Sequence, residues 1–437
     1  MFNQTRNSKI NDLTVEDRAY HDWYRFVLSF PPHLVRHYLD QFGANAGSMV
    51  LDPFCGTGTT LVESKKLGIA SVGCEANPVT HFASTVKLNW QIDPVSLIDH
   101  AEEIATRVQE VLSKEGFNEV FLLSSEQAEA FSKSADLQNL PESAWKIMLK
   151  NAISPVPLHK VLLLRQAIDR DAHPDFRALE RLALADIALR EASNLHFAPE
   201  VSVGRIKHDA WVIEPWLDKI RTMAADLHHL QDHAQVRSYV HHADARLLDE
   251  VLAPESIDIV FTSPPYPNEK DYTRITRLEM VLLGFAVDKP SLRALKNNLL
   301  RSNTRNIYKD DSDDQWVSRY ARIQVLASAI EDRRIALGKT SGFEKLYARA
   351  TKLYFGGMAR HLAALRPLLR PNAYLGYVVG DQASYLQVMI RTGEILAEIA
   401  DDLGYEVVTI DLFRTRLATA TKEQLREEVV VLRWRGN

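Results

Sequence analysis

The chain has 437 residues and a formal net charge of -5 at pH 7, so it is not a polycation, and nucleic-acid binding must rest on local basic patches. Its two cysteines, Cys55 and Cys74, are too few for a disulfide scaffold and favour a cytoplasmic protein. The sequence shows no cluster of metal-ligand type and no apolar run near the roughly 20 residues that cross a bilayer.

The first predicted unit is a strand, a loop, a helix and a second strand. Phe30-Pro31-Pro32 precedes an expected helix over 34–42, and residues 49–51 form a short apolar strand. The loop Asp52-Pro53-Phe54-Cys55-Gly56-Thr57-Gly58 follows, with a helix beginning near Thr59. Residues 69–73 are the next strand, which runs on to Glu75. This pattern is typical of a βαβ unit that binds a ligand at the carboxyl ends of its strands.

The loop and the second strand indicate a nucleoside-bearing cofactor. The glycines let the backbone turn sharply and let a ligand approach the main chain. Glu75 ends the second strand, where a carboxylate can accept hydrogen bonds from ribose hydroxyls. Asp52 opens the loop, and no dinucleotide or P-loop fingerprint is present, so a cofactor with a positively charged end fits better than a pyrophosphate.

Residues 91–235 are expected to be mostly helical. From 91 to 240 the chain carries 16 Lys/Arg against 23 Asp/Glu, so this segment is acidic and cannot contact DNA over its whole surface. Arg205 and Lys207, close to Trp211, are the best candidates for a local DNA contact there. A helical subdomain that only packs on the core is the alternative interpretation.

A second motif follows an expected strand over 257–261. Ser263-Pro264-Pro265-Tyr266 must leave the sheet, because prolines have no N–H for a strand ladder. The loop therefore presents Ser263 and Tyr266 at the carboxyl edge of the sheet.

The rest of the chain returns to the core after a second insertion over 291–354. Between 301 and 352 there are 11 Lys/Arg against 7 Asp/Glu, and Arg301 and Arg305 lie in a polar stretch that could contact DNA or be an ordinary solvated loop. We then expect a helix over 358–369, a turn at Pro371-Asn372, a strand over 374–379, a helix over 392–403, and strands over 406–412 and 428–434.

The loop from Asp52 to Gly58, together with Ser263-Pro264-Pro265-Tyr266, resembles the S-adenosylmethionine-dependent amino-methyltransferases of DNA, which modify N4 of cytosine or N6 of adenine. The resemblance implies a three-layer α/β/α Rossmann-like sandwich, whose mostly parallel sheet has one reversed strand, with a helical insertion. It covers roughly half of the chain, the two motifs and the strands around them. The division that it suggests is a core over 21–90, 236–290 and 355–437, with insertions over 91–235 and 291–354.

The resemblance also assigns roles to residues. The cofactor-binding set would be Phe30, Pro31, Asp52, Phe54, Gly56, Gly58, Thr59, Glu75 and Asp244. In this set Glu75 would hold the ribose, Asp244 the adenine amino group, and the glycine loop the methionine part. Ser263, Pro264, Pro265 and Tyr266 would be catalytic.

The chemistry of an amino group explains why such a loop is needed. The lone pair of an exocyclic amine is delocalised into the ring, so a catalyst must accept hydrogen bonds from its hydrogens and direct the lone pair at the methyl group. The Ser263 hydroxyl and the Pro264 carbonyl could accept those bonds, and Tyr266 could stack on a base that has left the duplex.

Two clues conflict over the base. Serine at the first position of this motif favours N4-cytosine in the family, whereas the cofactor motif preceding the catalytic motif is commoner among N6-adenine enzymes. The local chemistry favours cytosine. A tRNA or rRNA amino-methyltransferase and a catalytically silent cofactor-binding protein remain alternatives. DNA is the expected partner, with a cognate restriction endonuclease or a defence-system subunit as a further one.

Overall fold

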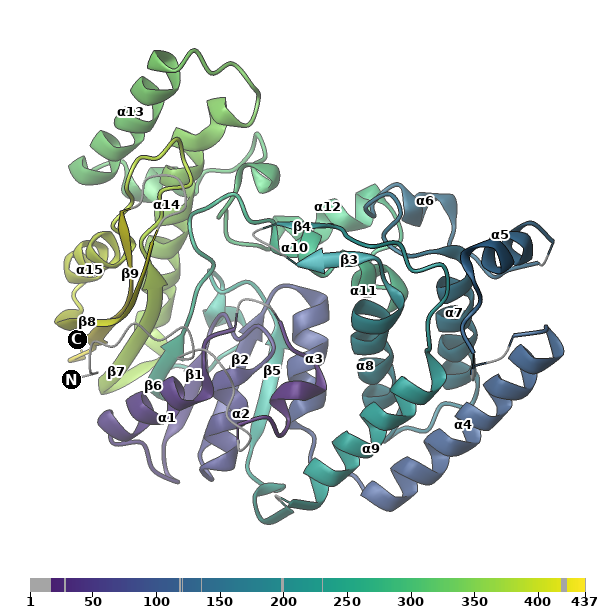
Figure 1. The fold of residues 1–437 in the computed structure, drawn as a ribbon. Coiled ribbons are helices and arrows are strands. Elements are labelled where there is room, and N and C mark those ends of the chain that lie inside the picture. The colour runs from purple at the N-terminus through teal and green to yellow at the C-terminus, as the bar shows by residue number, and fades with distance from the viewer. Residues whose placement is uncertain are drawn as a thin grey trace.

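The computed structural model describes residues 17–26, 29–117, 119, 121–134, 136–197, 200–229, 231–417 and 423–436. A seven-stranded sheet organises the chain in the order β5-β2-β1-β6-β7-β9-β8 (Figure 1). Its strands are β1 (Met49–Asp52), β2 (Ala70–Glu75), β5 (Ser238–His242), β6 (Ile257–Thr262), β7 (Leu369–Gly380), β8 (Glu406–Leu417) and β9 (Gln424–Arg433).

The sheet is parallel from β5 to β7, and β9 alone runs against its neighbours β7 and β8. The strands β1, β2 and β6 are short and mostly buried, which is why they read as apolar runs. On one face Val50 and Phe261 pack against α1 (Pro32–Gln41). On the other, Leu51 and Tyr377 pack against α14 (Tyr347–Leu365) and α15 (Thr392–Asp402). The expected α/β/α sandwich with one reversed strand is confirmed.

Helices α2 (Thr59–Lys66) and α3 (Pro78–Leu88) connect this sandwich to a largely helical part of the chain (Figure 1). One continuous apolar core runs from Leu61 and Ala83 into these helices, around the fully buried Trp216. The elements are α4 (Pro94–Lys114), α5 (Ser125–Ser134), α6 (Glu142–Trp145), α7 (Pro155–Arg170), α8 (Arg177–Ile187), α9 (Ile213–His229) and the hairpin of β3 (Leu195–Phe197) and β4 (Val201–Val203).

The chain between β6 and β7 forms the remaining helices. They are α10 (Tyr272–Ile275), α11 (Arg277–Leu282), α12 (Lys289–Asn297) and α13 (Ala321–Ala336). Helix α14 begins at Tyr347, well before the expected start at Met358, and the expected domain boundary at residue 354 falls within it. Among the residues that the structure describes, no helix combines the length and apolar character needed to cross a membrane.

Candidate active site

The carboxyl ends of β1, β2, β5 and β6 meet at one edge of the sheet, where a cavity of about 1220 Å³ opens. Two sequence motifs more than 200 residues apart, one after β1 and one after β6, contribute to it because β1 and β6 are neighbours in the sheet. The predicted residues that line the cavity are Phe30, Pro31, Phe54, Gly56, Thr59, Glu75, Asp244, Ser263, Pro264, Pro265 and Tyr266. Asp52 and Gly58 do not line it.

Gly56 forms the part of the loop that a ligand can approach most closely. Its φ of +52° lies in the left-handed region, which favours glycine. A Cβ atom built on Gly56 would meet nothing within 4 Å, so the backbone there faces open space. The Gly56 N–H donates to Oε2 of Glu75 at 2.8 Å, which fixes the loop against the end of β2.

The Glu75 carboxylate joins the glycine loop to the start of α3. Its second oxygen, Oε1, accepts from the Asn77 N–H at 2.7 Å. Burial raises the pKa of Glu75, although the backbone N–H donors oppose that shift. Each carboxylate oxygen has lone pairs left, so a cavity-lining Glu75 can also accept hydroxyl hydrogens from a ligand.

Asp52 lies behind the loop rather than in the cavity. It is completely buried, and its Oδ1 accepts from Thr262 Oγ1 at 2.6 Å and from the Phe54 N–H at 3.2 Å. Its Oδ2 has no hydrogen-bond partner among the described residues. Burial raises the pKa of Asp52 to about 7. Asp52, which was expected to bind the cofactor, does not line the cavity and instead links the glycine loop to the end of β6.

Gly58 is also a packing residue in this structure. Its φ is +86°, and a Cβ atom there would lie 3.0 Å from Cβ of Ser84 on α3. A glycine is thus needed for the turn and for the close approach of α3, rather than for the ligand contact that the motif suggested.

Asp244 lines the cavity, where the resemblance places the adenine contact, but it also has a partner. Nη2 of Arg246 donates to its Oδ2 at 2.6 Å, and Nε to its Oδ1 at 3.0 Å. The same guanidinium uses Nη1 to bind Oδ2 of Asp313 at 2.6 Å. Arg246 therefore fixes the orientation in which Asp244 faces the cavity.

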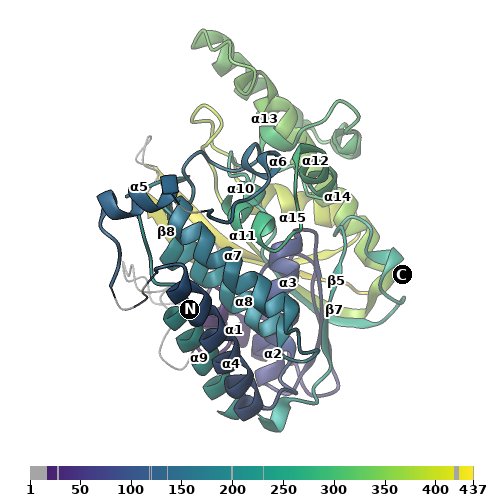
Figure 2. The ribbon, with the colours of Figure 1, turned by 90° about the vertical axis from the view of Figure 1, so that its right-hand side faces the viewer.

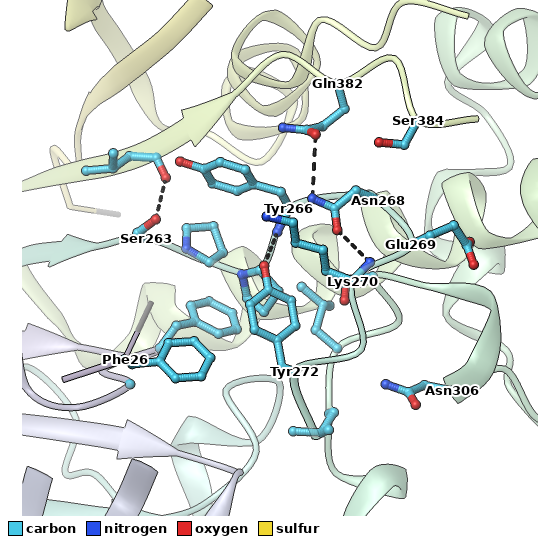
Figure 3. Close-up of a pocket in the computed structure, with 18 of the residues that line it drawn as sticks. Phe26, Ser263, Tyr266, Asn268, Glu269, Lys270, Tyr272, Asn306, Gln382 and Ser384 are labelled. Atoms are coloured by element: carbon cyan, nitrogen blue, oxygen red, sulfur yellow. Dashed lines mark hydrogen bonds between the residues drawn. The ribbon is translucent and has the colours of Figure 1, made fainter. Parts of the chain in front are cut away.

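The loop Ser263-Pro264-Pro265-Tyr266, predicted to be catalytic, leaves the sheet directly after Thr262, as its two prolines require. The Ser263 hydroxyl lies 3.1 Å from the carbonyl oxygen of Val378, to which it donates (Figure 3). The Tyr266 N–H donates to the hydroxyl oxygen of Tyr272 at 3.3 Å. Burial raises the pKa of the Tyr266 hydroxyl, which stays neutral near pH 7. Because the Ser263 hydroxyl hydrogen is engaged by Val378, the oxygen lone pairs of Ser263 remain available to accept hydrogen bonds from a substrate.

The segment after the loop supplies cavity residues that sequence reasoning missed. The Asn268 N–H donates to the Ser302 carbonyl oxygen at 3.0 Å, and Nδ2 of Asn303 donates to the Lys270 carbonyl oxygen at 3.1 Å. Asn306, from the same polar stretch, lines the cavity, is 2% exposed, and has an Oδ1 without a partner in the described part of the chain (Figure 3). Asn306 directly follows Arg305 in the same polar stretch, but nothing in the sequence favoured it over the neighbouring arginines.

Arg301 contradicts the expectation of a DNA contact. It is 4% exposed, and its Nε and Nη2 bind the two carboxylate oxygens of Asp311 at 2.9 and 2.8 Å. Its Nη1 donates to the carbonyl oxygens of Lys296 and Leu299, so the guanidinium holds the end of α12 from inside. A buried guanidinium with these partners cannot reach a phosphate.

The other three basic candidates lie at the surface. Arg305 is exposed, with its guanidinium 5.9 Å from the ring centroid of Phe343. Arg205 is exposed just after β4. Lys207 is half-buried, and its Nζ donates to the carbonyl oxygens of Arg190 and Glu191, so it mainly closes the helical turn after α8.

The residues around the cavity fit S-adenosylmethionine. Gly56 leaves room at the main chain, Glu75 offers acceptors, and the rings of Phe30 and Phe54 line the walls. Aromatic rings and a carboxylate suit an adenosine joined to a positively charged group. In the described residues no set of three or more His, Cys, Asp or Glu side chains is placed to hold a metal ion.

Comparison with known proteins agrees with this geometry. The N6/N4 family model described as a DNA methylase matches residues 3–84. The type II methyltransferase M.BsoBI of Geobacillus stearothermophilus is 23% identical over 448 aligned residues, which cover 96% of this chain and 85% of that protein. M.AvaI of Nostoc sp. is 27% identical over 187 residues, 41% of this chain and 38% of its own length. M.MjaII of Methanocaldococcus jannaschii is 37% identical over 68 residues, 16% and 13% of the two chains.

The match to M.BsoBI extends over nearly the whole chain, and the family model matches the segment that contains β1 and the glycine loop. The sheet order and the cavity at its carboxyl edge are those expected of such an enzyme. The family match and the nearly full-length similarity to a type II methyltransferase support an S-adenosylmethionine-dependent amino-methyltransferase that acts on DNA.

Proposed function

We propose that the chain methylates the N4 amino group of a cytosine that has been turned out of duplex DNA. S-adenosylmethionine supplies the methyl group. Ser263 carries the choice of cytosine, because serine at the head of this motif accompanies N4-cytosine activity in the family that the chain resembles. The alternative base is adenine, methylated at N6.

The cofactor would be held by the edge of the sheet that β1, β2 and β5 form. Glu75 would accept the ribose hydroxyls while it keeps the Gly56 N–H at 2.8 Å, so the same carboxylate shapes the loop and binds the ligand. Asp244, oriented by Arg246, would accept from the adenine amino group. Phe30 and Phe54 would exclude water from the methionine side.

The catalytic loop would activate the amino group by accepting its hydrogens. The Ser263 hydroxyl donates a hydrogen bond to the Val378 carbonyl oxygen at 3.1 Å, so its lone pairs would face the substrate as acceptors. The Pro264 carbonyl is a second acceptor on the same loop, and it is fixed before the base arrives. Two acceptors draw the nitrogen toward tetrahedral geometry and free its lone pair. The loop needs no covalent nucleophile.

Substrate entry requires the base to leave the helix. A base stacked inside the duplex cannot reach a loop at the edge of the sheet, and turning it out costs a few kcal/mol. The Tyr266 ring lines the cavity and could stack on the extruded base, which offsets part of that cost.

The direct test is to incubate the protein with isotopically labelled S-adenosylmethionine and mixed-sequence DNA, with total RNA in parallel. Mass spectrometry of the nucleosides should find labelled N4-methyldeoxycytidine. Labelled N6-methyldeoxyadenosine would replace cytosine by adenine. Label confined to RNA would overturn the proposal.

We also propose a cognate restriction endonuclease as the biological partner, since the relatives are named type II methyltransferases. DNA methylated by this chain should then resist an endonuclease that cuts the same site. Cutting at an unchanged rate after complete methylation of that site would contradict this pairing.

A further inference from the structure

A projecting segment at the mouth of the cavity has no role in the chemistry described above. This arm, residues 321–346, consists of α13, a turn and the short helix η8 (Glu344–Leu346). Figures 1 and 2 both show α13 extending beyond the end of the sheet. Ile323, Ala327 and Ile330 anchor its base in the core. From residue 335 to residue 343 every side chain is exposed, and we call this stretch the arm tip.

The arm tip is apolar where a solvated turn would be polar. Ile335, Leu337 and Phe343 are 62%, 45% and 53% exposed. Three large apolar side chains within nine exposed residues mark an interaction surface rather than a solvated turn. Leu337 also lines the catalytic cavity, so this surface reaches the place where the base must enter.

Basic side chains surround these apolar residues. Arg333 and Lys339 line the same cavity from the arm, and Arg414 and Arg416 line it from β8, where both pair with Glu427. No carboxylate among the described residues lies within ion-pair distance of Arg333, whereas Lys339 has a long contact of 3.6 Å to Glu344. In a chain of net charge -5, an arm cation without a carboxylate partner in the described part of the chain, beside the weakly paired Lys339, favours a polyanion as the partner.

Contacts also connect the arm tip to the catalytic loop. The Arg305 guanidinium lies 5.9 Å from the Phe343 ring centroid. The neighbouring Thr304 hydroxyl donates to Oε2 of Glu269 at 2.8 Å, three residues after Tyr266. The tip is therefore held in a fixed relation to the site that receives the base.

We propose that the arm tip is a wedge that enters the DNA duplex and keeps the target base extruded. Leu337 and Phe343 occupy the space that the base leaves and pack on its neighbours, while Arg333 and Lys339 bind the flanking phosphates. The inference rests on the proposed function in one respect: the enzyme acts on an extruded base. It holds equally for cytosine and for adenine.

The wedge is tested with the variant Leu337→Ala/Phe343→Ala and the control Val325→Ala, which removes a 69% exposed side chain from the anchored part of α13. Two duplexes carry the site found by nucleoside analysis and sequencing, one with the target base paired and one with it opposite an abasic position. At saturating DNA, methyl transfer by the double variant should fall about 10- to 100-fold on the paired duplex and by less than about threefold on the other, because an unpaired base is cheap to extrude. The control should match the wild type on both.

Equal losses on the two duplexes, or no loss on either, would overturn the wedge. An equal loss accompanied by a change in self-association, measured by analytical ultracentrifugation, would identify the arm tip as a contact between protein copies instead. The wild type on the same duplexes reports which base is methylated, so an error in the proposed base is recognised separately.

The phosphate contacts are tested without knowledge of the recognition site. Arg333→Glu/Lys339→Glu should weaken binding to a mixed-sequence duplex and reduce the slope of log K against log salt by about two, since each phosphate contact contributes about 0.9. Lys114→Glu/Lys133→Glu makes the same charge change on exposed residues of α4 and α5, away from the cavity, and should leave the slope unchanged. Equal slopes for the two variants would remove the arm from the DNA interface, whether or not methylation is detected.

Discussion

Replacing Glu75 by glutamine tests both of its functions, because the amide has the shape of the carboxylate but only one acceptor oxygen. The carboxylate now accepts from the Gly56 N–H at 2.8 Å and the Asn77 N–H at 2.7 Å. In Glu75→Gln one of these donors faces an NH2 group. The loss of one hydrogen bond to a charged acceptor corresponds to about 1.5–3 kcal/mol in the free energy of unfolding.

The free energy of cofactor binding should become less favourable by a similar amount. A ribose hydroxyl that loses a charged acceptor costs about 1.5–3 kcal/mol, which is about a 10- to 150-fold increase in Kd. Isothermal titration calorimetry with S-adenosylmethionine measures this change, and urea unfolding shows that the variant is folded at the titration temperature. Glu250→Gln, an exposed acid beyond β5, is the matched control and should bind like the wild type. An unchanged Kd for folded Glu75→Gln would remove Glu75 from the ribose site.

Three further variants test the loops around the cavity. Ser263→Ala should lower single-turnover methyl transfer by about 100-fold or more and leave cofactor affinity unchanged, since it deletes an acceptor for the amino group; full activity would refute the activation argument. Gly58→Ala should destabilise the fold by about 1–3 kcal/mol in urea, because of its φ of +86° and the contact with Ser84. Wild-type stability with lost cofactor affinity would instead make Gly58 a binding residue. In the folded state the pKa of Asp52 is raised to about 7. As pH rises, the unfolded chain therefore loses this proton before the folded chain does, and the free energy of unfolding falls between about pH 4 and pH 7. Asp52→Asn should therefore gain about 2 kcal/mol relative to the wild type between pH 5 and pH 8 in urea unfolding; a difference independent of pH would contradict the buried-carboxyl assignment.

The strands that carry the two motifs were predictable because local rules determine them. β1 and β6 are short apolar runs that stop at Asp52-Pro53 and just before Pro264-Pro265, and both ends agree with the structure to within a residue. Local rules failed at Pro371-Asn372, where a turn was expected. β7 continues through Asn372 at φ +70°, because pairing with β6 on either side of an irregularity outweighs the local preference.

Tertiary packing explains the other differences. The helix expected to begin at Met358 begins at Tyr347 and runs through Gly356. A glycine is needed there because the Asp313 backbone packs against it, and a Cβ would lie 1.8 Å from the Asp313 carbonyl oxygen. Arg301 was expected at the surface, but its partner Asp311 lies ten residues further on, in a loop whose path no local pattern reveals. Asn306 likewise became a cavity residue only through the hydrogen bonds that hold its loop to the segment after Tyr266.

Arg246 connects the cofactor edge of the cavity to the arm. One guanidinium holds both Asp244, at the cofactor edge of the sheet, and Asp313, which begins the turn η7 (Asp313–Val317) that leads into the arm. If the cofactor binds Asp244 and DNA contacts the arm, as proposed above, each ligand would change the contacts that this guanidinium makes on the other side. Such a coupling is reciprocal: whatever factor the cofactor applies to the affinity for DNA, DNA applies to the affinity for the cofactor. Under the proposed function, S-adenosylmethionine and DNA would then influence each other through a side chain that takes no part in the reaction.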